Sequence, residues 1–229
     1  MRFELPASVL VFMLSFGLCT RADPNAVYGV WASFVAMPAA NNSFWDLLAS
    51  GTAIVDAEPG TLQWLSLKDD AGPFVYLATF KTEAARAAHL AGRLPAALKA
   101  AAHQQLAQAP VFDSVTLLAS KVADGNAPQL RFTGSGNVVA ANATAAAHIK
   151  GVFTGSYYDA VLAQNYTNYW WMFQINATAF GLAAAWPTLE ARQEHSDSAA
   201  VSAMIAAVEP YAALFEIPQG SAIGQKIEV

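Results

Sequence analysis

Four apolar-rich segments occur in the N-terminal half of the chain, and the first of them, residues 27–36, alternates apolar and small residues as a strand does. Turn-forming residues separate these segments. Glu58-Pro59-Gly60 precedes the second, and residues 68–73 join the second to the third as a hairpin. The pattern predicts strands at 27–36, 61–67, 74–80 and 114–122.

Helices are predicted in the two longer intervals between these strands. Residues 41–43 supply candidate N-caps for a short helix through Leu48. Thr82 is a candidate N-cap for a long alanine-rich helix, whose apolar stripe is a leucine every four residues from Leu90 to Leu98. The predicted order of elements is therefore β-α-β-β-α-β.

The chain resembles itself without a gap at an offset of 106 residues, the distance from His89 to His195. The residues that recur in register are Thr61, Trp64, Phe74, Thr82, Arg86 and His89, matched by Thr167, Trp170, Phe180, Thr188, Arg192 and His195. This agreement predicts two copies of one structural unit.

The second copy is less regular before Thr167. Residues 157–164 are predicted as a short helix, and the strand that precedes it lies at either 130–140 or 149–155. Residues 123–147 are rich in alanine, glycine and asparagine, and we expect them to be a linker between the copies.

A lone β-α-β-β-α-β unit leaves one face of its sheet uncovered, and a second unit in the same chain can cover it. We therefore expect an α+β fold in which two ferredoxin-like units form one intramolecular barrel, and a chain that is a monomer. The expected organisation is a signal peptide at 1–22, a first unit at 23–122, a linker at 123–147 and a divergent second unit at 148–229.

Composition restricts the classes of function. Of 229 residues, 55% are hydrophobic and 13% are charged, which suits a globular chain with a sizeable core. The net charge of −5 and the absence of a Lys/Arg stripe argue against a nucleic-acid partner. One cysteine, Cys19, and four histidines form no zinc-binding pattern, so no metal is expected.

The first residues resemble a secretory signal peptide. Arg2 precedes an uncharged run at 7–19, and Thr20-Arg21-Ala22 is a small-x-small cleavage site. A run of this length is too short to span a bilayer, so no membrane association is expected of the mature chain. Four N-x-S/T sequons support secretion as a glycoprotein, at Asn41, Asn142, Asn165 and Asn176.

The segment from Ala57 through Glu58-Pro59-Gly60 to Trp64, followed by a strand that ends at Phe80 and then by His89, resembles the antibiotic biosynthesis monooxygenase (ABM) domain of the dimeric α/β-barrel superfamily. The second copy keeps Trp170 and the Trp186-x8-His195 spacing. It departs from the pattern at Gln164-Asn165-Tyr166, which replaces the Glu-Pro-Gly turn.

This resemblance implies a monooxygenase that needs no cofactor and oxidises a small aromatic, anthrone- or quinol-type substrate with O2. Such a reaction requires a base, an anchor for an oxyanion and a dry aromatic slot. The alternative is a non-catalytic barrel that binds a small hydrophobic ligand. Haem binding is a further alternative, although no motif accompanies the histidines.

The candidate catalytic residues of the first copy are Trp64, Tyr76, Arg86 and His89, and we expect this copy to hold the better-kept site. Trp64 could clamp a flat ring and Tyr76 could direct its hydroxyl into the same cavity. The imidazole of His89 titrates near neutrality, and the guanidinium of Arg86 can hold an anion. The counterparts in the second copy are Trp170, Arg192 and His195.

Each assignment has a structural alternative. For Trp64 and Tyr76, a place in the packed core is the favoured alternative. In a continuous helix, Arg86, His89 and Arg93 lie on the face opposite the leucine stripe, which predicts a solvated polar face instead of a site. Recurrence of the histidine and arginine in both copies supports the functional interpretation, and it is equally compatible with a shared requirement of the fold.

Overall fold

The computed structural model describes residues 27–228, except 71 and 124–127. Its first element is strand β1 (Tyr28–Phe34). The expected signal peptide at 1–22 lies outside the described residues. Within them, no helix is long and apolar enough to cross a membrane.

Both halves of the chain contain strands and helices in similar order. The N-terminal half continues with α1 (Asn41–Asp56), β2 (Thr61–Asp69), β3 (Phe74–Phe80), α2 (Glu83–Leu90), α3 (Arg93–Gln105) and β4 (Asp113–Val122). The C-terminal half contains β5 (Phe132–Ala140), α4 (Ala143–Thr154), α5 (Ser156–Ala163), β6 (Tyr169–Gln174), β7 (Ala179–Trp186), α6 (Leu189–Ser196), α7 (Ala199–Val208), β8 (Ala212–Glu216) and β9 (Gln219–Ile227).

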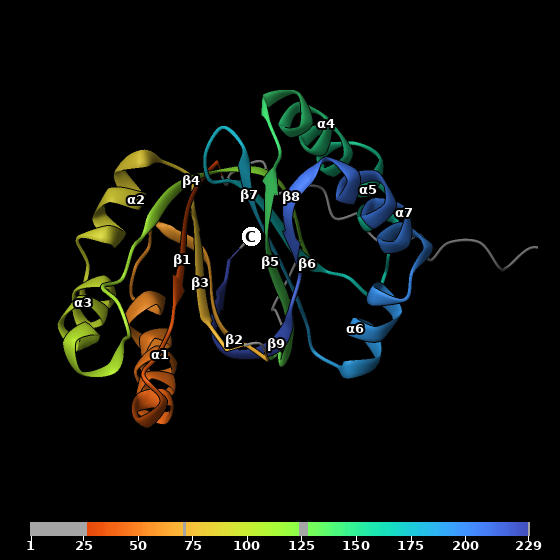
Figure 1. The fold of residues 1–229 in the computed structure, drawn as a ribbon. Coiled ribbons are helices and arrows are strands. Elements are labelled where there is room, and N and C mark those ends of the chain that lie inside the picture. The colour runs from red at the N-terminus through yellow and green to blue at the C-terminus, as the bar shows by residue number, and fades with distance from the viewer. Residues whose placement is uncertain (1–26, 71, 124–127, 229) are drawn as a thin grey trace, which may run out of the picture.

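The nine strands form one antiparallel sheet in the order β7-β6-β4-β1-β3-β2-β9-β5-β8. An additional pairing of β7 with β5 closes eight of them into a ring, and β8 lies outside the ring on β5. Helices α1–α3 cover one side of this barrel and α4–α7 cover the other (Figure 1). The closed ring leaves few free strand edges.

Strands of the two halves pair with one another at two seams. Strand β4 pairs with β6, and β2 pairs with β9. Two buried lysines reinforce the seams. Lys121 on β4 donates to the carbonyl of Val161 at 3.0 Å, and Lys226 on β9 donates to those of Val55 at 3.2 Å and Glu58 at 2.7 Å. Each lysine therefore satisfies carbonyls at the C-terminal end of a helix from the other half.

Side chains alternate between the barrel interior and the helix-covered face. Trp64 packs under the helices of the N-terminal half, whereas its neighbour Leu65 packs inside the barrel with Trp31, Trp171 and Phe173. A third cluster lies between the sheet and α4–α7. The structure therefore contains one barrel core and two helix–sheet layers.

The long helix expected after Thr82 is instead two helices. The N-cap is confirmed, because the hydroxyl oxygen of Thr82 accepts a hydrogen bond from the amide of Ala85. The first helix ends at Leu90, and Gly92 is the N-cap residue of the next. Pro95 suits the first turn of a new helix and would break the interior of a continuous one.

The expected linker at 123–147 contains a strand and the start of a helix. Residues 132–140 form β5, which contributes to the barrel, and α4 begins at Ala143. The other option for this strand, 149–155, is mostly helical. Gly134 and Gly136 were part of the expected linker, but they lie within the strand. A Cβ on Gly136 would lie 2.1 Å from the carbonyl oxygen of Glu216, so β8 can pair this closely only with glycine there.

Replacing Gly136 by alanine is therefore expected to destabilise the fold by roughly 1–3 kcal/mol, because β8 must move away from β5. Gly134→Ala is the matched control, since its Cβ would meet Trp186 at an ordinary 3.7 Å. Urea unfolding of both variants measures the difference. Equal stabilities would show that β8 contributes little to the folded state.

Candidate functional site

The structure joins His89 and Tyr76 of the N-terminal half in a buried chain of hydrogen bonds. The Tyr76 hydroxyl contacts His89 Nε2, and Glu58 Oε2 lies 2.5 Å from His89 Nδ1. Thr61 donates its hydroxyl hydrogen to the same carboxylate at 2.8 Å. This arrangement places the Nδ1 proton towards Glu58 and lets the tyrosine donate to Nε2.

His89 is 2% exposed, so the solvated polar face expected for it is wrong. The break at Gly92 ends α2 soon after His89, and the imidazole turns inward. Burial lowers the pKa of His89, and the neighbouring Glu58 opposes this change. Burial also raises the pKa of Tyr76 well above its usual value, so both rings are neutral near pH 7.

Arg86 is held away from this pair. Its guanidinium forms an ion pair with Glu83 at 2.5 Å, and it donates to the carbonyl oxygens of Gly29 and Val115. It also lies over the ring of Tyr28. These contacts tie α2 to the ends of β1 and β4.

Trp64 and Tyr76 are fully buried among other aromatic side chains of the N-terminal half. The rings that fill this layer include Phe34, Phe44, Phe74 and Phe80. A more open groove of about 370 Å³ lies beside the Glu58-Pro59-Gly60 turn and reaches the Glu58 side of the imidazole. The aromatic slot expected beside Trp64 is thus occupied by the protein's own rings.

In the C-terminal half, His195 occupies the equivalent position with different partners. Its Nδ1 lies 2.8 Å from Gln164 Oε1 and 3.0 Å from the hydroxyl of Thr167, and its Nε2 lies 3.2 Å from the hydroxyl of Tyr157. The glutamine oxygen can only accept, so Nδ1 carries the proton and Nε2 has a free electron pair towards Tyr157. Trp186 donates to Thr167 and completes the network.

Burial, with a smaller contribution from the charge of Lys121, lowers the pKa of His195 to about 4. Burial also raises the pKa of Tyr157 far above its usual value. Near pH 7 the pair therefore consists of a neutral imidazole that accepts and a phenol that donates.

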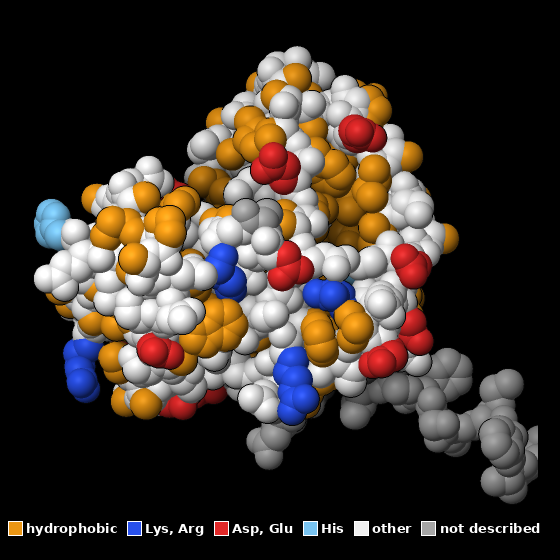
Figure 2. Space-filling view, turned by 60° about the horizontal axis from the view of Figure 1, so that its bottom comes forward, with side chains coloured by type: hydrophobic (Ala, Val, Ile, Leu, Met, Phe, Trp, Pro, Cys, Tyr) orange, Lys and Arg blue, Asp and Glu red, His pale blue; other side chains and the backbone are white. Residues whose placement is uncertain are grey.

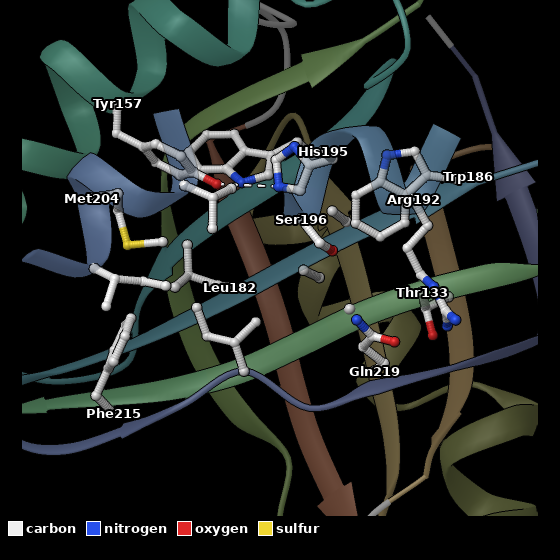
Figure 3. Close-up of a pocket in the computed structure, with 17 residues that line it drawn as sticks. Thr133, Tyr157, Leu182, Trp186, Arg192, His195, Ser196, Met204, Phe215 and Gln219 are labelled. Carbon is white, nitrogen blue, oxygen red and sulfur yellow. Dashed lines mark hydrogen bonds between the residues drawn. The ribbon is translucent and has the colours of Figure 1, made fainter. Parts of the chain in front are cut away.

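A cavity of about 340 Å³ lies beside this pair, between the sheet and helices α6 and α7. Figure 2 shows a hollow with hydrophobic walls on the half that carries α4–α7. In Figure 3, Tyr157 and His195 form one wall, and Met204, Leu182 and Phe215 extend the apolar surface. Trp170, Trp186 and Arg192 also line the cavity. Together with His195, Trp170 and Arg192 are the three candidates of the second copy, so the cavity brings all of them together.

The cavity lies where the C-terminal half has a smaller side chain than the N-terminal half. Leu182 stands 106 residues after Tyr76, so a leucine replaces the ring that closes the first layer. The tyrosine that reaches His195 comes instead from α5, at Tyr157. The better-kept site was expected in the first copy, whereas the cavity that reaches a histidine–tyrosine pair lies in the second.

Three positions that take part were not predicted as site residues. Glu58 and Gln164 are 106 residues apart and both contact the histidine Nδ1, so the repeat offset could have identified them. Tyr157 lies in the segment where the two copies no longer align, and no sequence pattern marked it.

Metal binding and glycosylation concern other residues of the chain. Among the described residues, no group of three or more His, Cys, Asp or Glu side chains could hold a metal ion. His148 stacks on Tyr211 and is bound to a backbone carbonyl. The four sequon asparagines are exposed, which is compatible with the predicted glycosylation but does not test it.

No protein-family model matches the chain, and no curated protein matches it either. Solved structures do. A "putative monooxygenase" from Fusobacterium nucleatum is 11% identical with a TM-score of 0.72 and covers 88% of this chain and 94% of its own. Another from Lactobacillus acidophilus is 12% identical with a TM-score of 0.67 and covers 89% and 97%.

An anthrone oxidase-like protein is 10% identical with a TM-score of 0.59, covering 89% of this chain and 94% of its own. At these identities the similarity is one of fold alone. The chain thus shares a mixed α+β barrel fold with these proteins.

Proposed function

We propose that the chain is a cofactor-independent monooxygenase that oxidises a small aromatic substrate of the anthrone or quinol type with O2 in the cavity of its C-terminal half. The observation that carries the proposal is the largely apolar cavity beside a neutral imidazole whose Nε2 accepts from Tyr157. The fold of the monooxygenase-like neighbours supports it.

The first step is removal of a proton from the substrate. A phenol or activated CH2 group of the substrate, next to Tyr157, gives its proton to the hydroxyl oxygen of Tyr157. At the same time, Tyr157 passes its own proton to His195 Nε2. His195 alone is a weak base because its pKa is about 4. The substrate anion formed beside it raises that pKa and stabilises the imidazolium.

The electron-rich anion then reduces O2. One electron passes to O2, and the resulting superoxide combines with the substrate radical to form a C–O bond. The proton held on His195 returns to give a hydroperoxide. At a CH2 carbon, loss of water from the hydroperoxide leaves a C=O group, so the sum is R2CH2 + O2 → R2C=O + H2O. The substrate supplies all four electrons.

We further propose that the chain comprises two ferredoxin-like units that arose by duplication, and that it acts as a monomer. The 106-residue offset, the similar element order and the β4–β6 and β2–β9 seams support this organisation. The signal-peptide pattern and the four sequons support a secreted glycoprotein.

Oxygen uptake by metal-stripped protein, measured with anthrones and hydroquinones against substrate autoxidation, tests the proposal. Wild-type uptake is expected to exceed autoxidation clearly. Leu182→Tyr, which copies Tyr76 of the closed half, is expected to reduce uptake to the autoxidation level. Leu182→Met keeps a similar volume and is the matched control.

Uptake that survives Leu182→Tyr would place the chemistry outside this cavity. Autoxidation-level uptake by the wild type across the panel would favour the alternative, a barrel that binds a hydrophobic ligand without turnover.

A further inference from the structure

Charge distinguishes the cavity of the C-terminal half from the corresponding region of the N-terminal half. Among the described residues that line the cavity, Arg192 is the single Lys or Arg, and there is no Asp or Glu. A cation on the wall of a largely apolar cavity keeps a strong preference for an anion.

Within the part of the chain that the structure describes, the arginine of the N-terminal half has a carboxylate partner and Arg192 has none. Arg86 pairs with Glu83 at 2.5 Å, whereas the residue 106 positions later than Glu83 is Leu189. The guanidinium of Arg192 lies over the ring of Phe132 and donates one long hydrogen bond, of 3.4 Å, to the carbonyl of Gly220. Among the described residues, the buried Nε of Arg192 has no hydrogen-bond partner, as is also true of Arg86, so the two arginines differ in the carboxylate.

A second carboxylate is replaced by a neutral group at the histidine. Glu58 contacts His89, and Gln164 contacts His195 through its amide oxygen. The two carboxylates that accompany the histidine and the arginine of the N-terminal half are therefore replaced by uncharged side chains in the C-terminal half. With neutral imidazoles, the group formed by Glu58, Glu83 and Arg86 has a formal charge of −1, and its counterpart has a charge of +1.

The positive charge lies at one end of the cavity. Figure 3 places the guanidinium of Arg192 near the amide of Gln219, whereas Met204 and Phe215 lie at the opposite end. A ligand with an acidic group at one end and an apolar ring system at the other matches this distribution.

We propose that the cavity binds an aromatic carboxylic acid, with the carboxylate on Arg192 and the ring between the apolar wall and the His195–Tyr157 pair. This names the substrate class of the proposed monooxygenase and rests on that function for its catalytic meaning. The planar guanidinium suits a carboxylate, to which it can donate two parallel hydrogen bonds.

Calorimetric titration with 2-naphthoate and its neutral analogue 2-naphthamide tests the proposal. The wild type is expected to bind the naphthoate at least about tenfold more tightly than the amide, as a charged hydrogen bond implies. Leu189→Glu restores the N-terminal pairing and places an acid in the first turn of α6, where the helix dipole favours it. It should remove the preference while leaving the amide's affinity unchanged.

Leu189→Gln is the matched control and should keep the preference, and Arg192→Gln should lose it independently. Equal binding of both probes by the wild type would overturn the proposal. Binding of neither, or a preference unchanged in Leu189→Glu and Arg192→Gln, would overturn it too. The readout does not involve O2. Selective naphthoate binding without turnover would therefore reject only the monooxygenase function, and turnover without the preference would reject only this inference.

Discussion

Replacing His195 by glutamine is expected to lower turnover of an oxidised substrate by about 10²–10⁴-fold, the usual contribution of a general base. The imidazole is the acceptor for the Tyr157 proton, and its tautomer is fixed by Gln164. Glutamine keeps polar contacts with the neighbouring hydroxyls, but it cannot hold a proton in this step. Oxygen uptake at saturating substrate measures the loss.

His89→Gln is the informative comparison because His89 has the equivalent position in the N-terminal half, where aromatic rings fill the layer around Trp64 and Tyr76. Its Nε2 contacts Tyr76 among fully buried rings, so we expect turnover at the wild-type level. Near-UV circular dichroism checks that both variants are folded. A loss confined to His89→Gln would move the reaction to the N-terminal half, where the sequence first suggested it.

Much of the barrel could be predicted from the sequence because strand alternation and turn residues are local properties. The hairpin strands 61–67 and 74–80 lie within β2 and β3, and the Thr82 cap is present. Strand β5 was one of two options, and its segment was also assigned to a linker, because its glycines indicated a flexible connection instead of the close contact with β8 that they make. Local composition does not distinguish these two uses of glycine.

The site was predictable only in part, for a physical reason. Recurrence identified His195, Arg192 and Trp170, which do line one cavity. Whether a layer is filled or hollow depends on the volumes that meet from several elements. The exchange of Tyr76 for Leu182, with Tyr157 entering from α5, is such a tertiary effect. This effect cannot be predicted from any single segment of the sequence.

The pH dependence of stability provides the second large effect, and two buried groups contribute with opposite signs. The pKa of His195 falls from the ordinary 6.5 to about 4 in the folded state, mainly through burial. Between these values the unfolded chain binds more protons, so stability decreases as pH falls through this window. The expected loss is about 3 kcal/mol. The lowered pKa of His89 acts in the same direction.

Asp69 contributes to the pH dependence of stability with the opposite sign. It is buried and accepts a hydrogen bond of 2.7 Å from Ser135, and burial raises its pKa from 3.8 to about 6. Between these values the folded chain binds more protons, so stability increases as pH falls. This gain is also about 3 kcal/mol, and it offsets much of the loss at His195. The wild-type profile should therefore be flatter than that of either single variant.

Urea unfolding of the wild type, His195→Gln and Asp69→Asn from pH 7 to pH 4 separates the two contributions. His195→Gln should gain about 3 kcal/mol relative to the wild type as pH falls to 4, because the variant has no imidazole to protonate. Asp69→Asn should be more stable at pH 7 by a similar amount and lose that advantage near pH 4, because its amide resembles the protonated acid at every pH. Parallel curves for the wild type and His195→Gln would mean that the imidazole titrates normally. His195 would then be charged in the mildly acidic range, and it could not accept the Tyr157 proton there.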